Sequence, residues 1–206
     1  SEMEAHVAKR AAFYGSQREL LAPFTDAKAL DGLEAARRGA PALPARTPCV
    51  VVQPEEIEAE LRDYQLASLD WFGDCYERCG ALPCILGDEM GLGKTLQTIA
   101  YLAWLKFEKR APGASLVLCP LSVLSTWLGE CARWCPKLRV LKLHSSDVAE
   151  RERLRKRVVE GVGDYDVVVT TYEMAKAPSL RGALVQKVVW RCLVLDEGHV
   201  IKNHET

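Results

Sequence analysis

The segment CILGDEMGLGKT, residues 84–95, decides the fold that we predict for this chain. It joins a short apolar run, Cys84–Leu86, to a loop with three glycines and then to a helical pattern over residues 94–108. A strand, a glycine-containing loop and a helix in this order are typical of a phosphate-binding loop, in which main-chain N–H groups at a helix N-terminus surround a phosphate. Lys94 would supply positive charge for the β- and γ-phosphates, and Thr95 a hydroxyl ligand for Mg²⁺.

The match to the phosphate-loop pattern is relaxed, because the first glycine of GxxxxGK[ST] would fall on Asp88. The alternative is a plain glycine turn that precedes a helix carrying a solvated lysine. The predicted nucleotide-binding residues in this segment are Asp88, Glu89, Met90, Gly91, Leu92, Gly93, Lys94 and Thr95.

An acidic pair, Asp196-Glu197, follows the apolar run Leu193–Leu195 and is followed by Gly198-His199. At the carboxyl end of a strand beside bound nucleotide, Asp196 could hold Mg²⁺ while Glu197 orients and deprotonates the attacking water. His199 would face the same cleft. The alternative is a strand that simply reaches the surface in acidic residues. Together, the loop and the pair predict hydrolysis of a nucleotide such as ATP, with Lys94, Asp196 and Glu197 as the catalytic residues.

Apolar runs alternate with helical patterns along the rest of the chain. This rhythm is typical of an α/β fold with a parallel sheet, which needs helices on both faces and collects ligands at the carboxyl ends of its strands. The predicted strands are Cys84–Leu86, Ser115–Cys119, Val140–Leu143, Val167–Thr170 and Cys192–Leu195, and the predicted helices cover residues 94–108, 122–134, 147–160 and 174–186.

The N-terminal region has a different character. Residues 4–38 show two helical patterns, and residues 39–54 contain four prolines, which are typical of a linker. A further helix is predicted from Leu61 to a C-terminal cap at Gly80. We therefore predict a helical extension with a linker over residues 1–54 and an ATP-binding domain over residues 55–206. The extension either packs on that domain or serves regulation and partner binding.

Composition excludes some classes of protein. The 206 residues are 49% hydrophobic with a formal charge of −1, and no apolar run is long enough to span a membrane.

The eight cysteines lie mostly in apolar runs and include no CxxC pair, so we expect packing and no zinc site. Trp127 and Trp134 are expected in the core. The basic run Arg151–Arg157 is interleaved with glutamates, which favours a solvated helix face over a DNA-binding patch.

Five blocks of sequence occur in an order that resembles the SWI/SNF-type chromatin-remodelling ATPases, relatives of the superfamily-two helicases. The resemblance covers about residues 55–206 and corresponds to the first RecA-like lobe of that family. The blocks are Leu61–Gln65, Asp88–Thr95, Leu118–Leu124, Thr170–Glu173 and Asp196–His199 with Lys202-Asn203.

The resemblance implies an ATP-driven translocase that acts on double-stranded DNA or nucleosomes in the nucleus. It also implies that Gln65 reads adenine and that His199 couples ATP hydrolysis to DNA. Pro120, Ser122, Thr170 and Thr171 would then line the DNA track, through phosphate contacts that carry no sequence information. Each role has a simpler alternative, since Gln65 could be a solvated helix residue and the two threonines could serve only to form a strand.

The sequence departs from the family pattern in three places. Gly198 replaces a common alanine, and Val200 replaces a common basic residue. The sequence ends at Thr206, before the family's second RecA-like lobe and its arginine finger, so we expect the isolated chain to hydrolyse ATP negligibly. Two other functions stay open: a truncated module that binds nucleotide or partner proteins without hydrolysis, and a strand-separating helicase.

Overall fold

The computed structural model describes residues 2–38 and 45–201, and its contacts divide the chain into two units. The first unit contains the described residues up to Gln53 together with Leu61–Lys94, and the second contains Pro54–Glu60 together with the described residues from Thr95 onward. The predicted boundary between residues 54 and 55 differs from this division, because α4 (Asp63–Glu77) and the phosphate loop fall in the same unit as the N-terminal helices.

The second unit is built on a parallel four-stranded sheet in the order β2-β3-β1-β4. The strands are β1 (Ser115–Cys119), β2 (Val140–Leu143), β3 (Val167–Thr171) and β4 (Cys192–Leu195). Val117 in β1 lies opposite Val169 in β3 and Val194 in β4. Four of the five predicted strands are therefore confirmed, and so is the parallel α/β class.

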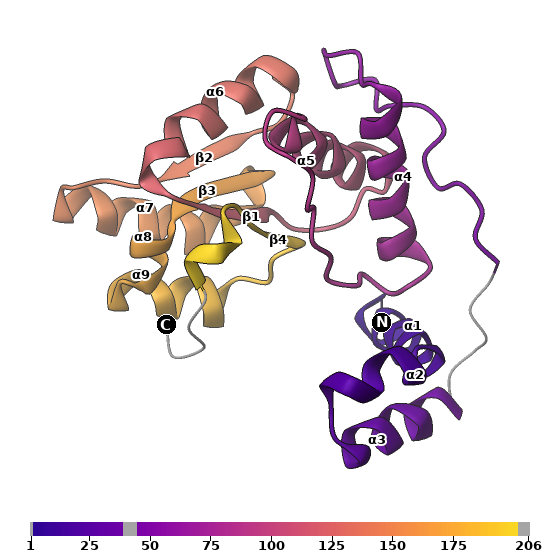
Figure 1. The fold of residues 1–206 in the computed structure, drawn as a ribbon. Coiled ribbons are helices and arrows are strands. Elements are labelled where there is room, and N and C mark those ends of the chain that lie inside the picture. The colour runs from indigo at the N-terminus through magenta and orange to yellow at the C-terminus, as the bar shows by residue number, and fades with distance from the viewer. Residues whose placement is uncertain (1, 39–44, 202–206) are drawn as a thin grey trace. The chain divides into compact units, whose positions relative to one another are not determined.

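Helices cover both faces of this sheet (Figure 1). One face carries α6 (Leu124–Trp134), which follows the short 3-10 turn Leu121–Val123. The other carries α7 (Val148–Gly161), α8 (Tyr172–Lys176) and α9 (Pro178–Gly182), and buries a core against the strands. That core contains Leu116, Leu141, Leu143, Leu154, Val158, Val168, Met174, Leu180, Leu184 and Val188.

Two of the predicted helices are modified. The helix over residues 94–108 forms as α5 (Lys94–Ala103) and continues as a π-helical turn, Trp104–Glu108. The helix over residues 174–186 instead divides into α8, α9 and a further π-helical turn, Ala183–Lys187. The division falls at Ala177, whose ψ of 128° is extended because proline disfavours helical geometry in the residue before it.

The predicted strand Cys84–Leu86 does not form. Its residues belong to no helix or strand, and Ile85 is 88% exposed. A strand exists only where a neighbouring backbone supplies ladder hydrogen bonds, and the described sheet ends at β4. The apolar pattern was therefore insufficient evidence for a strand at this position.

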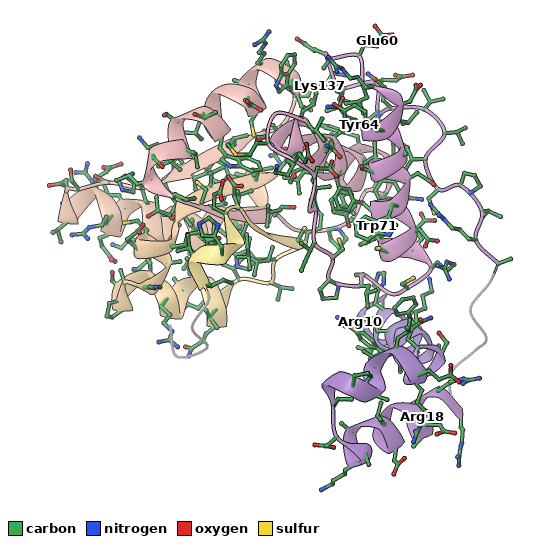
Figure 2. All side chains as sticks on the ribbon, in the orientation of Figure 1. Arg10, Arg18, Glu60, Tyr64, Trp71 and Lys137 are labelled. Atoms are coloured by element: carbon green, nitrogen blue, oxygen red, sulfur yellow. The ribbon has the colours of Figure 1, made fainter. Side chains whose placement is uncertain are left out.

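The N-terminal part of the first unit consists of α1 (Glu2–Ser16), α2 (Arg18–Leu21) and α3 (Ala27–Arg38), with a 3-10 turn at Ala22–Phe24. Two long helices form within residues 4–38 as predicted, but the first ends at Ser16, and Leu20, Leu21 and Phe24, which were expected in it, lie in α2 and the 3-10 turn. α1 packs against α3, and the Arg18 guanidinium (Figure 2) donates to the Glu34 carboxylate at 2.8 Å.

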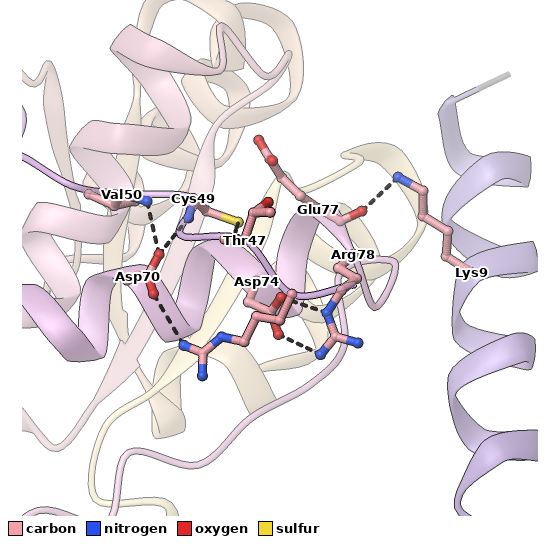
Figure 3. A network of polar contacts seen from close by, with 9 residues as sticks. Lys9, Thr47, Cys49, Val50, Asp70, Asp74, Glu77 and Arg78 are labelled. Carbon is pink, nitrogen blue, oxygen red and sulfur yellow. Dashed lines mark hydrogen bonds and ion pairs between the residues drawn. The ribbon is translucent and has the colours of Figure 1, made fainter. Parts of the chain in front are cut away.

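Hydrogen bonds hold the segment Cys49–Val50 and helix α1 against α4 (Figure 3). The Asp70 carboxylate accepts hydrogen bonds from the main-chain N–H groups of Cys49 and Val50 at 2.6 and 2.9 Å. The Lys9 ammonium of α1 donates to the carbonyl oxygen of Glu77 at 2.6 Å. The second half of the predicted linker is thus tied to α4, while residues 39–44 lie outside the described residues.

The cysteines are mainly packing residues. Cys75, Cys79, Cys131 and Cys135 are all buried, which agrees with the expectation that most cysteines are packing residues. Within residues 2–38 and 45–201, no group of three or more His, Cys, Asp or Glu side chains could hold a metal ion. In the same part of the chain, no helix is long and apolar enough to cross a membrane.

Candidate nucleotide-binding site

The phosphate loop has the backbone geometry that its glycines predict. Gly91 and Gly93 adopt φ values of 87° and 75°, in the left-handed region that side chains disfavour. The loop leads directly into the N-terminus of α5, where the first N–H groups of a helix favour an anion. The Lys94 ammonium donates to the carbonyl oxygens of Asp88 and Glu89 at 2.8 and 3.0 Å. The lysine therefore lies against the loop that it is predicted to serve.

Gln65 connects the loop to α4. Its side-chain nitrogen donates to the carbonyl oxygen of Leu92 at 3.1 Å, and its side-chain oxygen accepts from the N–H of Arg62 at 3.1 Å. The Tyr64 hydroxyl, also on α4, donates to the Leu92 oxygen at 3.3 Å (Figure 2). Gln65 is only 5% exposed, so it is not the solvated helix residue of the simpler alternative.

The acidic pair follows β4 at the carboxyl end of the sheet. The N–H of Asp196 donates to the carbonyl oxygen of Leu118 at 2.9 Å, which extends the pairing with β1. Glu197 has a φ of 53°, a strained value for a residue with a side chain, and its N–H donates to Asp196 Oδ1 at 3.0 Å. His199 Nδ1 lies 3.1 Å from Glu197 Oε2. The structure thus places His199 beside the predicted catalytic base.

Two aromatic residues contact Asp196, and the sequence did not single them out for this role. Trp127 Nε1 donates to Asp196 Oδ2 at 2.7 Å, and the Tyr172 hydroxyl donates to the Asp196 carbonyl oxygen at 2.7 Å. Trp127 is 3% exposed, which confirms the expected core position, but its N–H also serves the acidic pair. Burial, together with the nearby charge of Asp196, raises the pKa of Tyr172, so its hydroxyl keeps the proton that it donates.

The predicted DNA-facing residues divide into two groups. Ser122 is exposed and Pro120 half-buried, at the start of the segment that leads into α6. Thr170 and Thr171 are buried: the Thr170 hydroxyl donates to the Leu143 carbonyl oxygen at 2.6 Å, and the Thr171 hydroxyl accepts from the Met174 N–H at 3.2 Å. To donate to a phosphate, the Thr170 hydroxyl would have to leave the Leu143 oxygen, and the Thr171 hydroxyl, which only accepts in this contact, is buried. Lys202-Asn203 lies outside the described residues.

The basic run on α7 behaves as a solvated helix face. Arg155 pairs with Glu152 at 2.5 Å, and Arg153 pairs with Glu150 at 3.4 Å. Arg157 donates to the Tyr165 hydroxyl. Since these arginines have partners within the protein, the structure gives no reason to add them to the site.

Comparison with known proteins shows extensive similarity. Residues 64–206 match the family model of the SNF2-related domain. The human SWI/SNF-related matrix-associated actin-dependent regulator of chromatin subfamily A member 1 is 43% identical over 146 residues, which are 71% of this chain and 13% of that protein. The Arabidopsis thaliana ISWI chromatin-remodeling complex ATPase CHR17 is 40% identical over 157 residues, 76% of this chain and 14% of the relative.

A solved structure shows the same fold. The Sulfolobus solfataricus SWI2/SNF2 ATPase core in complex with dsDNA superimposes with a TM-score of 0.61 at 36% identity, over 76% of this chain and 30% of that chain. The chain therefore spans 13 to 14% of the length of these curated relatives and under a third of the solved core.

Proposed function

This chain belongs to the SNF2-related domain family, and from that premise we propose that it forms the ATP-binding RecA-like lobe of a DNA-dependent ATPase. In the whole protein, ATP hydrolysis would drive movement on double-stranded DNA or nucleosomes; one relative is named as a regulator of chromatin and another as a chromatin-remodeling complex ATPase. A second RecA-like lobe would complete this enzyme, since the chain covers 30% of the solved core. Residues 55–206 would form the lobe and residues 1–54 its helical extension.

The observation that carries the proposal is the presence of both a glycine-containing loop directly before a helix N-terminus and an acidic pair directly after a parallel strand. Gly91 and Gly93 supply left-handed backbone before the N-terminus of α5, and Lys94 lies against the loop. Asp196 and Glu197 follow a parallel strand at its carboxyl end, where α/β proteins bind ligands.

The residues fit a nucleotide that carries Mg²⁺. Mg²⁺ is commonly held by one or two carboxylates plus substrate phosphates, so the absence of a larger acidic cluster from the described residues is compatible with it. Each oxygen of the Asp196 carboxylate accepts one hydrogen bond from the protein and retains capacity for a metal ion or its water. Thr95, at the second position of α5, would supply the hydroxyl ligand.

Different side chains of this chain would have different roles in ATP hydrolysis. Bound ATP with Mg²⁺ supplies the phosphoanhydride bond that is cleaved. Lys94 would neutralise phosphate charge, and Glu197 would orient the attacking water and accept its proton. Gln65 would keep Leu92, and with it the loop, at a fixed distance from α4. His199, beside Glu197, would couple this base to DNA.

Double-stranded DNA is the proposed partner because the similar solved core is a complex with dsDNA. The exposed Ser122 and neighbouring Pro120 would contact its phosphates without reading sequence. One relative is named as a regulator of chromatin and another as a chromatin-remodeling complex ATPase, and on that basis we propose that the protein acts in the nucleus.

Nucleotide binding by this chain tests the proposal first. A fluorescent ATP analogue should bind in the presence of Mg²⁺, and Lys94→Ala should weaken binding by about tenfold or more, since it removes a charged hydrogen-bond donor to phosphate. Lys156→Ala, which removes an exposed lysine of α7, is the matched control and should bind normally. Binding that is absent, or equal in the two variants, would contradict the proposal.

Hydrolysis tests the second step. In a protein that carries this chain together with a second RecA-like lobe, duplex DNA should stimulate ATP hydrolysis. Glu197→Gln should abolish the stimulated rate and leave ATP binding intact, because the amide retains the shape of the side chain but cannot accept the proton. Nucleotide binding without any response to DNA would reject the translocase and leave only a binding module.

A further inference from the structure

Every polar group of Asp196 has a partner within the second unit. Its N–H donates to Leu118, its carbonyl oxygen accepts from Tyr172, and Oδ1 accepts from the N–H of Glu197. The remaining oxygen, Oδ2, accepts from the indole N–H of Trp127 at 2.7 Å. The strand and the following turn fix the main chain, so Trp127 is the side chain that sets how the carboxylate is rotated.

Trp127 belongs to an element that begins at the predicted DNA contact. Pro120 leaves β1, the turn Leu121–Val123 follows, and α6 starts at Leu124, so Trp127 lies in the first turn of α6. Leu124 and Trp127 are both almost fully buried, at 3% exposure each, whereas Leu121 and Ser122 are exposed. A phosphate held by the exposed turn would therefore act on the same continuous segment that carries the indole.

A second connection runs through β3. Tyr172 follows Thr171 directly, and the Thr171 hydroxyl caps α8 by accepting from the Met174 N–H. The Tyr172 side chain is buried and reaches the main chain of Asp196. The two segments that were predicted to face DNA thus each lead into a helix, α6 or α8, that supplies one aromatic hydrogen-bond donor to the same acidic residue.

We propose that Trp127 is a positioning residue, which orients the Asp196 carboxylate toward Mg²⁺ and transmits displacement of the turn Leu121–Val123 to it. The proposal rests on the proposed function, because it needs Asp196 to hold the metal ion and the turn to meet DNA. Hydrogen-bond partners of metal-binding groups commonly set the affinity for the metal by orienting these groups. The simpler alternative is that Trp127 only packs in the core, in which case its loss would change stability alone.

A variant that keeps an aromatic ring at position 127 but lacks the indole N–H distinguishes a positioning role of Trp127 from a packing role. Trp127→Phe should raise the Mg²⁺ concentration needed for half-maximal binding of a fluorescent ADP analogue by about tenfold. Binding at saturating Mg²⁺ should change much less. Trp190→Phe is the matched control, because Trp190 is also partly buried in the second unit but donates its N–H to the Leu184 carbonyl oxygen. Its Mg²⁺ dependence should equal that of the unmodified chain.

The indole N–H signals provide a readout that does not depend on turnover. The chain has five tryptophans, so isotope labelling gives few signals, and Trp127→Phe identifies the one of interest. Two additions should move this signal: MgADP alone, and a short DNA duplex without nucleotide. The Trp190 signal should stay in place. Asp196→Asn should shift the Trp127 signal before any addition, since it removes the charge from the acceptor.

The outcomes are distinguishable. If MgADP and the duplex bind, as measured by fluorescence anisotropy, while the Trp127 signal and the Mg²⁺ dependence of Trp127→Phe stay unchanged, Trp127 has only a packing role and the proposal is wrong. If neither MgADP nor the duplex binds at all, the proposed function itself fails, and the inference falls with it. If Trp127→Phe unfolds the chain, the signal shifts in the unmodified chain still decide the question.

Discussion

The ammonium nitrogen of Lys106 lies 2.8 Å from a carboxylate oxygen of Asp166, whose side chain is only 2% exposed. The same carboxylate accepts from the main-chain N–H and the guanidinium of Arg139 at 3.0 to 3.1 Å. Its main-chain oxygen accepts from the N–H of Ser115 at 2.9 Å. One buried acid therefore fastens the starts of β1, β2 and β3 to the turn that follows α5, at the end of the sheet opposite the acidic pair.

Replacement of this acid should destabilise the second unit. Asp166→Asn should lower the free energy of unfolding by about 2 to 4 kcal/mol, because it removes the charge that Lys106 and Arg139 share in a buried position. Urea unfolding followed by circular dichroism measures this. Glu152→Gln is the control, since its ion pair with Arg155 lies at the solvent-facing side of α7, where such pairs contribute little to stability. An equal decrease in the free energy of unfolding of both variants would show that burial of Asp166 does not increase its contribution to stability.

The contribution of Asp166 should depend on pH in a defined window. Burial raises the pKa of its carboxyl, but hydrogen bonds from Arg139 and Lys106 outweigh burial and hold the pKa at about 2. An unfolded Asp has a pKa of about 3.9, so the folded state binds the proton less readily. The stabilisation is complete above about pH 4 and is lost as pH falls toward 2, by about 2.5 kcal/mol in all. The stability difference between the unmodified chain and Asp166→Asn should shrink over this range and stay constant from pH 5 to 8.

Much of this architecture was predictable from the sequence because the signals are local. The runs at Ser115–Cys119, Val140–Leu143 and Cys192–Leu195 became strands with the predicted bounds. A short apolar run has few other outcomes once helical patterns flank it on both sides. The glycines of the phosphate loop likewise took the left-handed backbone that their residue type permits at low cost.

The predictions that were wrong or incomplete depend on contacts between residues that are far apart in the sequence. Cys84–Leu86 has the apolar character of a strand, but pairing requires a neighbouring backbone, which no local pattern can reveal. Trp127 could be predicted as a core residue, yet its N–H meets a carboxylate 69 positions later. A buried indole usually needs an acceptor, and that requirement is the only signal that could have indicated a polar role.

The turn after α4 should tolerate no side chain. Gly80 has a φ of 75°, and an added Cβ would lie 2.2 Å from the carbonyl oxygen of His6 in α1. Gly80→Ala should therefore cost at least about 1 to 2 kcal/mol and loosen α1 from this end of α4, because a main-chain atom cannot easily move aside. Limited proteolysis should then cut residues 2–38 faster. Gly32→Ala, in α3, meets nothing within 4 Å and should be neutral or stabilise the helix by about 0.5 to 1 kcal/mol.

Thiol labelling should separate the cysteines by burial. Burial raises the pKa of Cys131 to about 12 and that of Cys119 and Cys135 to about 11, so these thiols stay protonated and inaccessible near pH 8. Cys84 is exposed. Brief alkylation of the folded chain at pH 8, mapped by mass spectrometry, should modify Cys84 first and the three buried thiols only after urea is added. Early modification of Cys131 would contradict the packing described for α6.

The role of Gln65 can be decided by comparing two nucleotides. Family resemblance predicts that Gln65 reads adenine, whereas the structure engages its amide at both ends, with Arg62 and with Leu92 of the phosphate loop. If support of the loop is its main role, Gln65→Ala should weaken ATP and GTP by the same factor, about three- to tenfold for one lost hydrogen bond.

Competition against a fluorescent ATP analogue measures both affinities. Gln65→Glu refines the result, because its carboxylate can still accept from the Arg62 N–H but cannot donate to the Leu92 oxygen. This variant should therefore lose affinity for both nucleotides as well. Ser68→Ala removes an exposed hydroxyl from the same helix and should leave both affinities unchanged. A loss confined to ATP would instead show that the Gln65 amide leaves Leu92 when nucleotide binds and turns to the base.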